Sequence, residues 1–195
     1  MGRRILIIDG HPDPEGGHLC HALVAAYRAG AEAAGHAVRQ VDAARLDVPF
    51  VRSQEEWRLP TRQPVVAQAQ ADMVWAEHVV LVFPLWLGDM PAAMKHGLEH
   101  LSSGGAMIER DAAGRWHKKL SGRSARMIVT MGMPALIYRL FYFSHALRSL
   151  RRNILGFSGL SPVRESLFGN VEGPDRAAAR ARWIADVRHL GETAG

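Results

Sequence analysis

Short apolar runs alternate with longer stretches of helical periodicity along this chain. Five runs have the length and composition of strands, at residues 4–9, 37–42, 78–83, 125–130 and 162–168. Helical patterns lie between or after them, at residues 18–34, 65–76, 91–101, 138–155 and 175–190. Because strands and helices alternate, the pattern predicts an α/β fold with one doubly wound parallel sheet and helices on both of its faces.

The number of strands also predicts their order. A five-stranded sheet of this kind commonly has the flavodoxin-like order 2-1-3-4-5, in which the first, third and fourth strands are neighbours. With 195 residues, of which 48% are hydrophobic, the chain can bury one core. We therefore expect a single flavodoxin-like domain over residues 1–195.

Two segments do not fit the alternation. Residues 43–64 have weak periodicity and are expected to form an irregular connection with short helical turns. Residues 102–123 are rich in glycine and charge, and they are longer than a usual connection in a compact domain. The second segment is either a functional flap or an insertion.

Three strands are followed by turns rich in glycine and proline, at residues 10–17, 84–91 and 130–134. In the predicted order these turns lie side by side at the carboxyl edge of the sheet. Ligands of open α/β sheets bind at that edge. The three turns therefore predict one binding site.

The first turn has the composition of an anion site. Gly16 and Gly17 allow a phosphate to approach the main chain, and the helix that follows supplies free N–H groups. His11 can add a ring donor. The turn matches neither G-x-G-x-x-G nor the P-loop. A plain turn capped by a histidine is the alternative.

The second turn can hold a flat ring. Its segment Pro84, Leu85, Trp86, Leu87 and Gly88 offers backbone amides to the heteroatoms of such a ring, while the Trp86 and Leu87 side chains offer apolar contact. The alternative is that Trp86 belongs to the core.

The third turn and the helix after it offer further polar groups. Thr130 has a hydroxyl, and Gly132 permits close backbone approach. We expect Tyr138 and His145, seven residues apart, on one helical surface. A phenol and an imidazole can stabilise developing negative charge, although such a pair can also be purely structural.

Charge and composition exclude several classes of protein. The net charge of +5 suits anionic ligands, but the chain has no nucleic-acid-binding signature, so no nucleic-acid partner is expected. The single Cys20 excludes an internal disulfide framework. The longest apolar run, residues 79–87, is too short for a membrane span, and the N-terminal residues do not resemble a signal peptide, so we expect a cytoplasmic protein.

Some polar residues have spacings that suggest other sites. His18 and His21, and likewise His96 and His100, are spaced like metal ligands, but H-G-L-E-H differs from H-E-x-x-H, and no metal is expected. Asp42 follows the second strand, where a ribose-binding acid stands in dinucleotide-binding folds. A turn cap is the alternative for Asp42.

These motifs resemble those of the flavodoxin-like NAD(P)H:quinone oxidoreductases, the group of DT-diaphorase and the potassium-efflux ancillary proteins. Residues 5–12 resemble the opening motif, whose histidine lies near the flavin phosphates. Residues 83–95 resemble the block F-P-L-x-W-x-x-x-P-A-x-L-K, whose backbone holds the isoalloxazine ring. Residues 130–133 with Tyr138 resemble the T-T-G-G block and its tyrosine, and His145 falls near the active-site histidine.

The chain also departs from that family's motifs. Residues 16–18 are Gly-Gly-His where the family has Ser-Phe/His-Asn, and the aromatic Trp86 stands one place early. Met131 and Met133 replace a threonine and a glycine. Residues 102–123 lack the tyrosines that shape the quinone pocket in the best-known members.

The resemblance implies a flavin enzyme that passes two electrons from NAD(P)H to a quinone or similar soluble acceptor by a ping-pong mechanism. FAD is favoured over FMN, because the larger branch of the family uses it. Tyr138 and His145 would be catalytic. The cofactor-binding residues would be His11, Gly16, Gly17, His18, Pro84, Leu85, Trp86, Leu87, Gly88, Thr130, Met131, Gly132 and Met133.

The family is usually homodimeric, and the aromatic segment 138–143 is a candidate for the dimer contact. Two other functions remain open. One is a flavin-bearing regulatory or partner-binding subunit with incidental turnover. The other is a flavin-free α/β domain that binds a nucleotide or a sugar phosphate.

Overall fold

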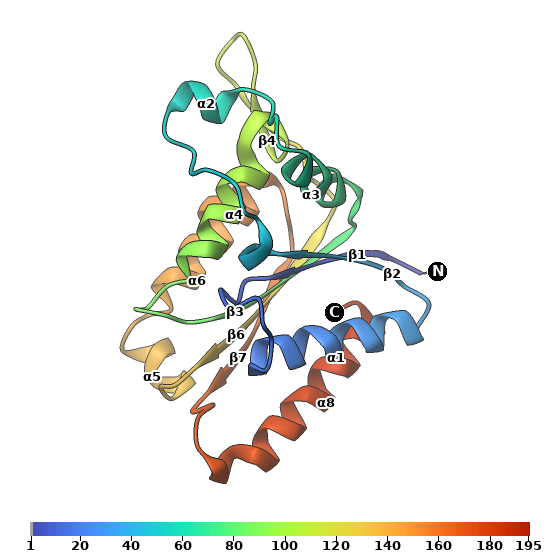
Figure 1. The fold of residues 1–195 in the computed structure, drawn as a ribbon, viewed down its shortest axis with the longest axis vertical. Coiled ribbons are helices and arrows are strands. Elements are labelled where there is room, and N and C mark those ends of the chain that lie inside the picture. The colour runs from blue at the N-terminus through green and yellow to red at the C-terminus, as the bar shows by residue number, and fades with distance from the viewer. Residues whose placement is uncertain (1) are drawn as a thin grey trace.

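Five parallel strands form the central sheet of the computed structural model, which describes residues 2–195 (Figure 1). In the order of the sheet they are β2 (Ala37–Asp42), β1 (Arg4–Asp9), β3 (His78–Pro84), β6 (Ser124–Met131) and β7 (Val163–Gly169). Counted along the chain, this is the order 2-1-3-4-5. The predicted fold class and strand order are confirmed.

Helices cover both faces of the sheet (Figure 1). On one face lie α1 (Leu19–Ala33) and α8 (Ala177–Thr193), preceded by the short helix η4 (Pro174–Arg176). On the other lie α3 (Pro64–Trp75) and α4 (Ala92–Ser102). Within residues 2–195, every helix is too short or too polar to span a bilayer.

The strands are apolar on both sides because each side faces a helical layer. Ile5 and Ile7 of β1 belong to the core beneath α1 and α8, whereas Leu6 and Ile8 belong to the opposite core. All seven residues of β3 are buried. This double burial explains the continuous apolar runs in the sequence.

Two glycines allow α1 and α8 to approach closely. A Cβ added to Gly30 would lie 1.9 Å from the Arg188 carbonyl oxygen, and one added to Gly191 would lie 2.1 Å from that of Tyr27. Neither position can hold a larger residue unless the helices separate. This contact fixes α1, whose start forms part of the site described below.

The irregular segment 43–64 contains η1 (Ala43–Arg45) and α2 (Gln54–Arg58), as expected. Residues 102–123 contain η2 (Ser103–Gly105) and a separate antiparallel hairpin of β4 (Ile108–Arg110) and β5 (Trp116–Lys118). The hairpin is not part of the central sheet.

The prediction of a single helix over residues 138–155 is wrong. The chain forms α5 (Ala135–Leu140), α6 (His145–Ser149), the π-helix η3 (Leu150–Leu155) and the short α7 (Gly156–Ser158). The break lies at Phe143 and Ser144, whose φ angles are +51° and +49°. Two successive left-handed residues reverse the chain, and helical periodicity does not predict this conformation for residues other than glycine.

Candidate functional site

Three contacts bring the three turns together. The Leu85 N–H donates to the Thr130 carbonyl at 2.8 Å, which joins the second turn to the third. The Cys20 thiol at the start of α1 lies 3.3 Å from the Thr130 hydroxyl. The ring centroids of His11 and Trp86 are 6.1 Å apart. The structure therefore gathers the turns at one edge of the sheet.

The first turn presents unpaired backbone donors. Among residues 2–195, no acceptor pairs with the N–H groups of Gly16, Gly17, Leu19 and Cys20. The two glycines have φ values of +86° and +81°, and a Cβ on either would meet open space. These donors at the start of a helix are suited to an anion.

Three imidazole rings surround this turn. The His11 ring stacks on the His18 ring, with centroids 4.1 Å apart. The centroid of the His21 ring lies 4.8 Å from that of His11. The pKa of His11 is lowered, first by burial and then by His18 and His21. Because His11 Nδ1 accepts from the Asp13 N–H at 3.1 Å, the neutral ring carries its proton on Nε2, where it can be donated to a ligand.

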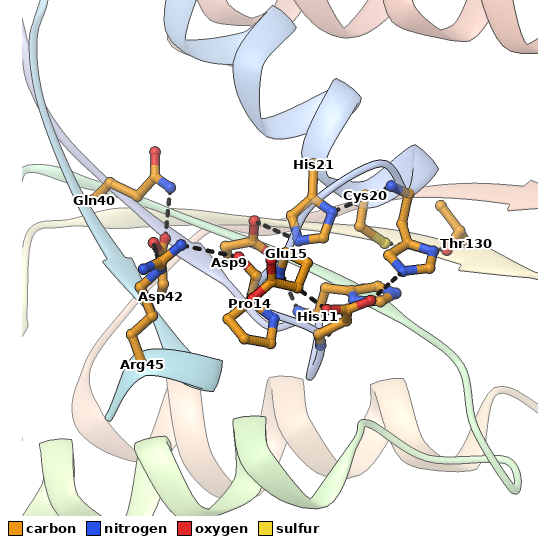
Figure 2. Close-up of polar contacts among 12 residues, drawn as sticks. Asp9, His11, Pro14, Glu15, Cys20, His21, Gln40, Asp42, Arg45 and Thr130 are labelled. Atoms are coloured by element: carbon orange, nitrogen blue, oxygen red, sulfur yellow. Dashed lines mark hydrogen bonds and ion pairs between the residues drawn. The ribbon is translucent and has the colours of Figure 1, made fainter. Parts of the chain in front are cut away.

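Asp9 is a residue of this region that the sequence analysis missed. Its buried carboxylate accepts the His11 N–H at 3.0 Å, and its second oxygen lies 3.7 Å from His21 Nε2 (Figure 2). Burial raises the pKa of Asp9. The available signal was a carboxylate at the end of an otherwise apolar strand.

A cavity of about 360 Å³ opens beside the first turn, between α1 and β2. Arg45 closes one side of it by donating to the Pro14 carbonyl at 2.9 Å (Figure 2). Asp42 accepts from Gln40 at 2.6 Å and lies 3.5 Å from Arg45, so it is held by its own neighbours. Four acids line the cavity, namely Asp9, Asp13, Glu15 and Asp42.

The second turn ends in an exposed tip. Trp86 and Asp89 exchange two backbone hydrogen bonds of 2.8 and 2.9 Å. Leu87 and Gly88 between them both have positive φ, as a tight two-residue turn requires. Trp86 is 51% exposed and Leu87 is fully exposed, whereas Pro84 is buried and Leu85 is half-buried. Among residues 2–195, the N–H groups of Leu87 and Gly88 have no acceptor.

The third turn offers mainly its backbone. Thr130 and Met131 are buried, and the Thr130 hydroxyl is engaged by Cys20. The carbonyls of Met131 and Met133 accept from Val171 and Asn170. Gly132 is exposed, and its N–H has no acceptor among residues 2–195. Its amide is therefore the group of this turn that is available to a ligand.

Tyr138 and His145 do not share a helical surface, because the break at residues 143–144 places them on α5 and α6. Tyr138 is buried, and its hydroxyl has no hydrogen-bond partner among residues 2–195. Burial raises its pKa. His145 is exposed, with its ring 5.9 Å from that of Phe143.

The two histidine pairs that are spaced like metal ligands, His18 with His21 and His96 with His100, have protein partners. His18 Nε2 lies 2.8 Å from Asp13 Oδ2. His96 and His100 lie 3.1 and 2.8 Å from the carbonyl oxygens of Val48 and Pro49, which they anchor to α4. Over residues 2–195, no three His, Cys, Asp or Glu side chains are grouped so that they could hold a metal ion.

Comparisons with known proteins agree with the fold. The model of the family described as flavodoxin-like fold matches residues 3–190. A search of curated proteins gave no match.

Several solved structures are similar to the whole chain. The NAD(P)H:quinone oxidoreductase from Methanothermobacter marburgensis has a TM-score of 0.80 at 18% identity, covering 100% of both chains. An azoreductase from Bacillus anthracis has a TM-score of 0.73 at 17% identity, covering 99% of this chain and 100% of the other. A FMN-dependent NADH-azoreductase from the same organism, in complex with FMN, has a TM-score of 0.74 at 14% identity, covering 100% and 99%.

Proposed function

Because the chain belongs to the flavodoxin-like fold family, we propose that it is a flavin-dependent oxidoreductase that passes two electrons from NAD(P)H to a soluble small-molecule acceptor such as a quinone. One observation carries the proposal: unpaired amides of all three turns lie at the same edge of the sheet, beside the exposed Trp86. The proposal is also supported by the similarity to structures described as a quinone oxidoreductase and an azoreductase.

In this proposal the first turn holds the flavin phosphate. The N–H groups of Gly16 and Gly17 and the start of α1 donate to the phosphate oxygens. His11 adds a neutral Nε2 donor, and the stacked His18 ring adds a second imidazole. The glycine amides and His11 Nε2 fit an anion, since they are donors without protein acceptors, whereas His18 Nε2 already lies 2.8 Å from Asp13 Oδ2.

The second and third turns hold the ring. The Leu87 and Gly88 amides can donate to its heteroatoms, while the Trp86 indole gives apolar contact. The Gly132 amide approaches from the third turn. A flavin held by these turns would supply two-electron transfer between NAD(P)H and the acceptor. The amides of Leu87, Gly88 and Gly132 would stabilise negative charge on a ring bound beside them.

Tyr138 and His145 remain the proposed catalytic side chains. The exposed His145 can give a proton to an acceptor. The Tyr138 hydroxyl has no protein acceptor among residues 2–195 but is buried, so it would act on a ligand only after a shift of α5 exposes it. Their position on two separate helices lets them act independently.

We propose FMN, in place of the FAD expected from the sequence, as the cofactor. The cavity next to the first turn, where a second phosphate would lie, is lined by Asp9, Asp13, Glu15 and Asp42 and by two arginines, Arg28 and Arg45, of which Arg45 already pairs with Asp42. The excess of carboxylates disfavours a second phosphate there. The similar azoreductase that is described as FMN-dependent supports the same choice.

The decisive experiment is a visible spectrum of purified protein after incubation with FMN and removal of the excess. We expect a bound flavin that bleaches on anaerobic addition of NADH or NADPH and recovers when a quinone is added. Protein that stays colourless would contradict flavin binding. A bound flavin that does not bleach would favour the regulatory subunit instead.

We further propose that the protein is a homodimer. Six apolar side chains of α5 and the break after it are between 45% and 73% exposed, namely Leu136, Ile137, Leu140, Phe141, Tyr142 and Phe143. Contiguous apolar surface of this kind marks an interaction site. Light scattering should give a dimer for the wild type and a monomer for Phe141→Asp, while Val74→Asp, at another exposed apolar position, stays dimeric.

A further inference from the structure

A second cavity lies apart from the three turns, between α2, η2 and the β4–β5 hairpin. Its volume is about 590 Å³, within the range of about 300–1,000 Å³ for small-molecule sites. Figure 1 shows α2 and β4 at the same end of the molecule. The walls include Trp57, Arg58, Gly104, Ile108, Arg110 and Trp116. We refer to it as the hairpin cavity.

The helix α4 separates the hairpin cavity from the proposed flavin site. It begins at Ala92, just after the second turn, and ends at Ser102, just before η2. Eleven residues of helix extend about 16 Å. A ligand of the hairpin cavity is therefore distinct from a flavin held by the three turns.

Trp116 provides a flat wall with a cation over one face of its ring. Its indole is 47% exposed and is held by an edge contact to Phe157, with centroids 5.5 Å apart. The Arg110 guanidinium lies 5.7 Å from the centroid of the same indole. Arg110 Nε donates to the Gly114 carbonyl at 3.0 Å, which fixes the position of the guanidinium.

The charge that remains in the hairpin cavity is positive. Of its two acids, Glu109 pairs with Lys119, and Asp111 pairs with Arg115 and His117. Among residues 2–195, no carboxylate lies within ion-pair distance of Arg58 or Arg110. Arginine side chains without a carboxylate partner, next to an exposed indole, are suited to an anionic group on an aromatic ring.

We propose that the hairpin cavity binds a planar aromatic anion, which stacks on Trp116 while its acidic group lies between Arg58 and Arg110. Stacking supplies the apolar contact, and the two guanidinium groups distinguish an anion from a neutral ring of the same shape. This inference depends only on the hairpin cavity, so it stands or falls independently of the proposed flavin chemistry.

Naphthalenesulfonate is a suitable probe, and calorimetry of the protein, both alone and in the presence of FMN, measures its binding. We expect saturable binding of one probe per chain. Arg58→Gln and Arg110→Gln should each weaken it about tenfold, the effect of losing about 1.4 kcal/mol. Naphthalenemethanol, which has the same rings but no charge, should bind at least about tenfold more weakly.

The controls separate this site from other binding. Arg152→Gln changes an exposed arginine elsewhere and should leave the affinity unchanged. Both variants in the cavity retain a side chain of similar length at a surface position, so unchanged melting temperatures show that they fold. The proposal is overturned if binding is not saturable, if it persists in both variants, or if Trp86→Phe abolishes it, because the probe would then occupy the flavin site.

Discussion

The thiol of Cys20 lies 3.3 Å from the hydroxyl of Thr130, although 110 residues separate them in the chain. Thr130 also accepts the Leu85 N–H through its carbonyl. One residue of β6 thus contacts both the start of α1 and the second turn. The relative positions of the three turns are therefore set by contacts to Thr130, and so is the space in which a ring and its phosphate can lie.

The burial of Cys20 predicts that its thiol is unreactive in the folded protein, although the hydrogen bond to Thr130 by itself lowers the thiol pKa. Burial raises the pKa of this thiol to about 12, and the reactive thiolate is scarce at pH 8. Ellman's reagent should therefore label no thiol in native protein within an hour and one per chain in guanidinium chloride. Rapid labelling of the native protein would show that α1 opens away from Thr130.

His11 should contribute to binding the phosphate but not the ring. Its Nε2 donor is directed by the Asp13–Nδ1 hydrogen bond, and a hydrogen bond to a charged group contributes about 1.5–3 kcal/mol. His11→Phe should therefore weaken FMN binding about tenfold or more while changing riboflavin affinity little. Quenching of flavin fluorescence measures both affinities.

His189→Gln is the matched control for that measurement, because it removes an exposed histidine at the end of α8. It should bind both flavins like the wild type. Equal losses of FMN and riboflavin affinity in His11→Phe would mean that His11 shapes the turn and does not contact the phosphate.

Most of the sheet could be predicted from sequence because its signals are local. The bounds of β1 and β2, Arg4–Asp9 and Ala37–Asp42, match the predicted runs, since apolar periodicity and burial coincide there. The order of the strands follows from general rules for parallel sheets. The turns fall at the predicted edge for the same reason.

The parts that could not be predicted depend on contacts between distant residues. The pairing of Asp9 with His21 and of Cys20 with Thr130 requires the folded chain. The reversal at Phe143 and Ser144 uses left-handed residues that have no periodic signal. Periodicity therefore predicts Tyr138 and His145 on one helix, whereas the structure places them on α5 and α6.

The contact between α1 and α8 predicts a large loss of stability from a single methyl group. Gly30→Ala and Gly191→Ala would each place a Cβ about 2 Å from a carbonyl oxygen of the facing helix. Overpacking of this kind typically costs about 1–3 kcal/mol, although alanine favours helix formation. Urea denaturation should show the loss in both variants.

Ala185→Ser on the exposed side of α8 is the control, and it should change stability by less than about 0.5 kcal/mol. If Gly30→Ala were as stable as the wild type, the two helices would have to lie further apart than the structure places them.

His78 should make the folded protein sensitive to acid. The ring is buried on β3, Ser124 Oγ lies 2.8 Å from its Nδ1, and burial followed by the charges of Arg3 and Arg126 lowers its pKa to about 3. In the unfolded chain the pKa is about 6.5, so between these values only the unfolded chain binds the proton, and stability falls as the pH falls. The loss from this group is about 2 kcal/mol between pH 7 and pH 5.

His78→Phe keeps a ring beside Tyr27 but cannot titrate, so its urea midpoint should fall less over this interval than that of the wild type or of His189→Gln. An equal fall in all three proteins would mean that His78 is protonated in the folded state.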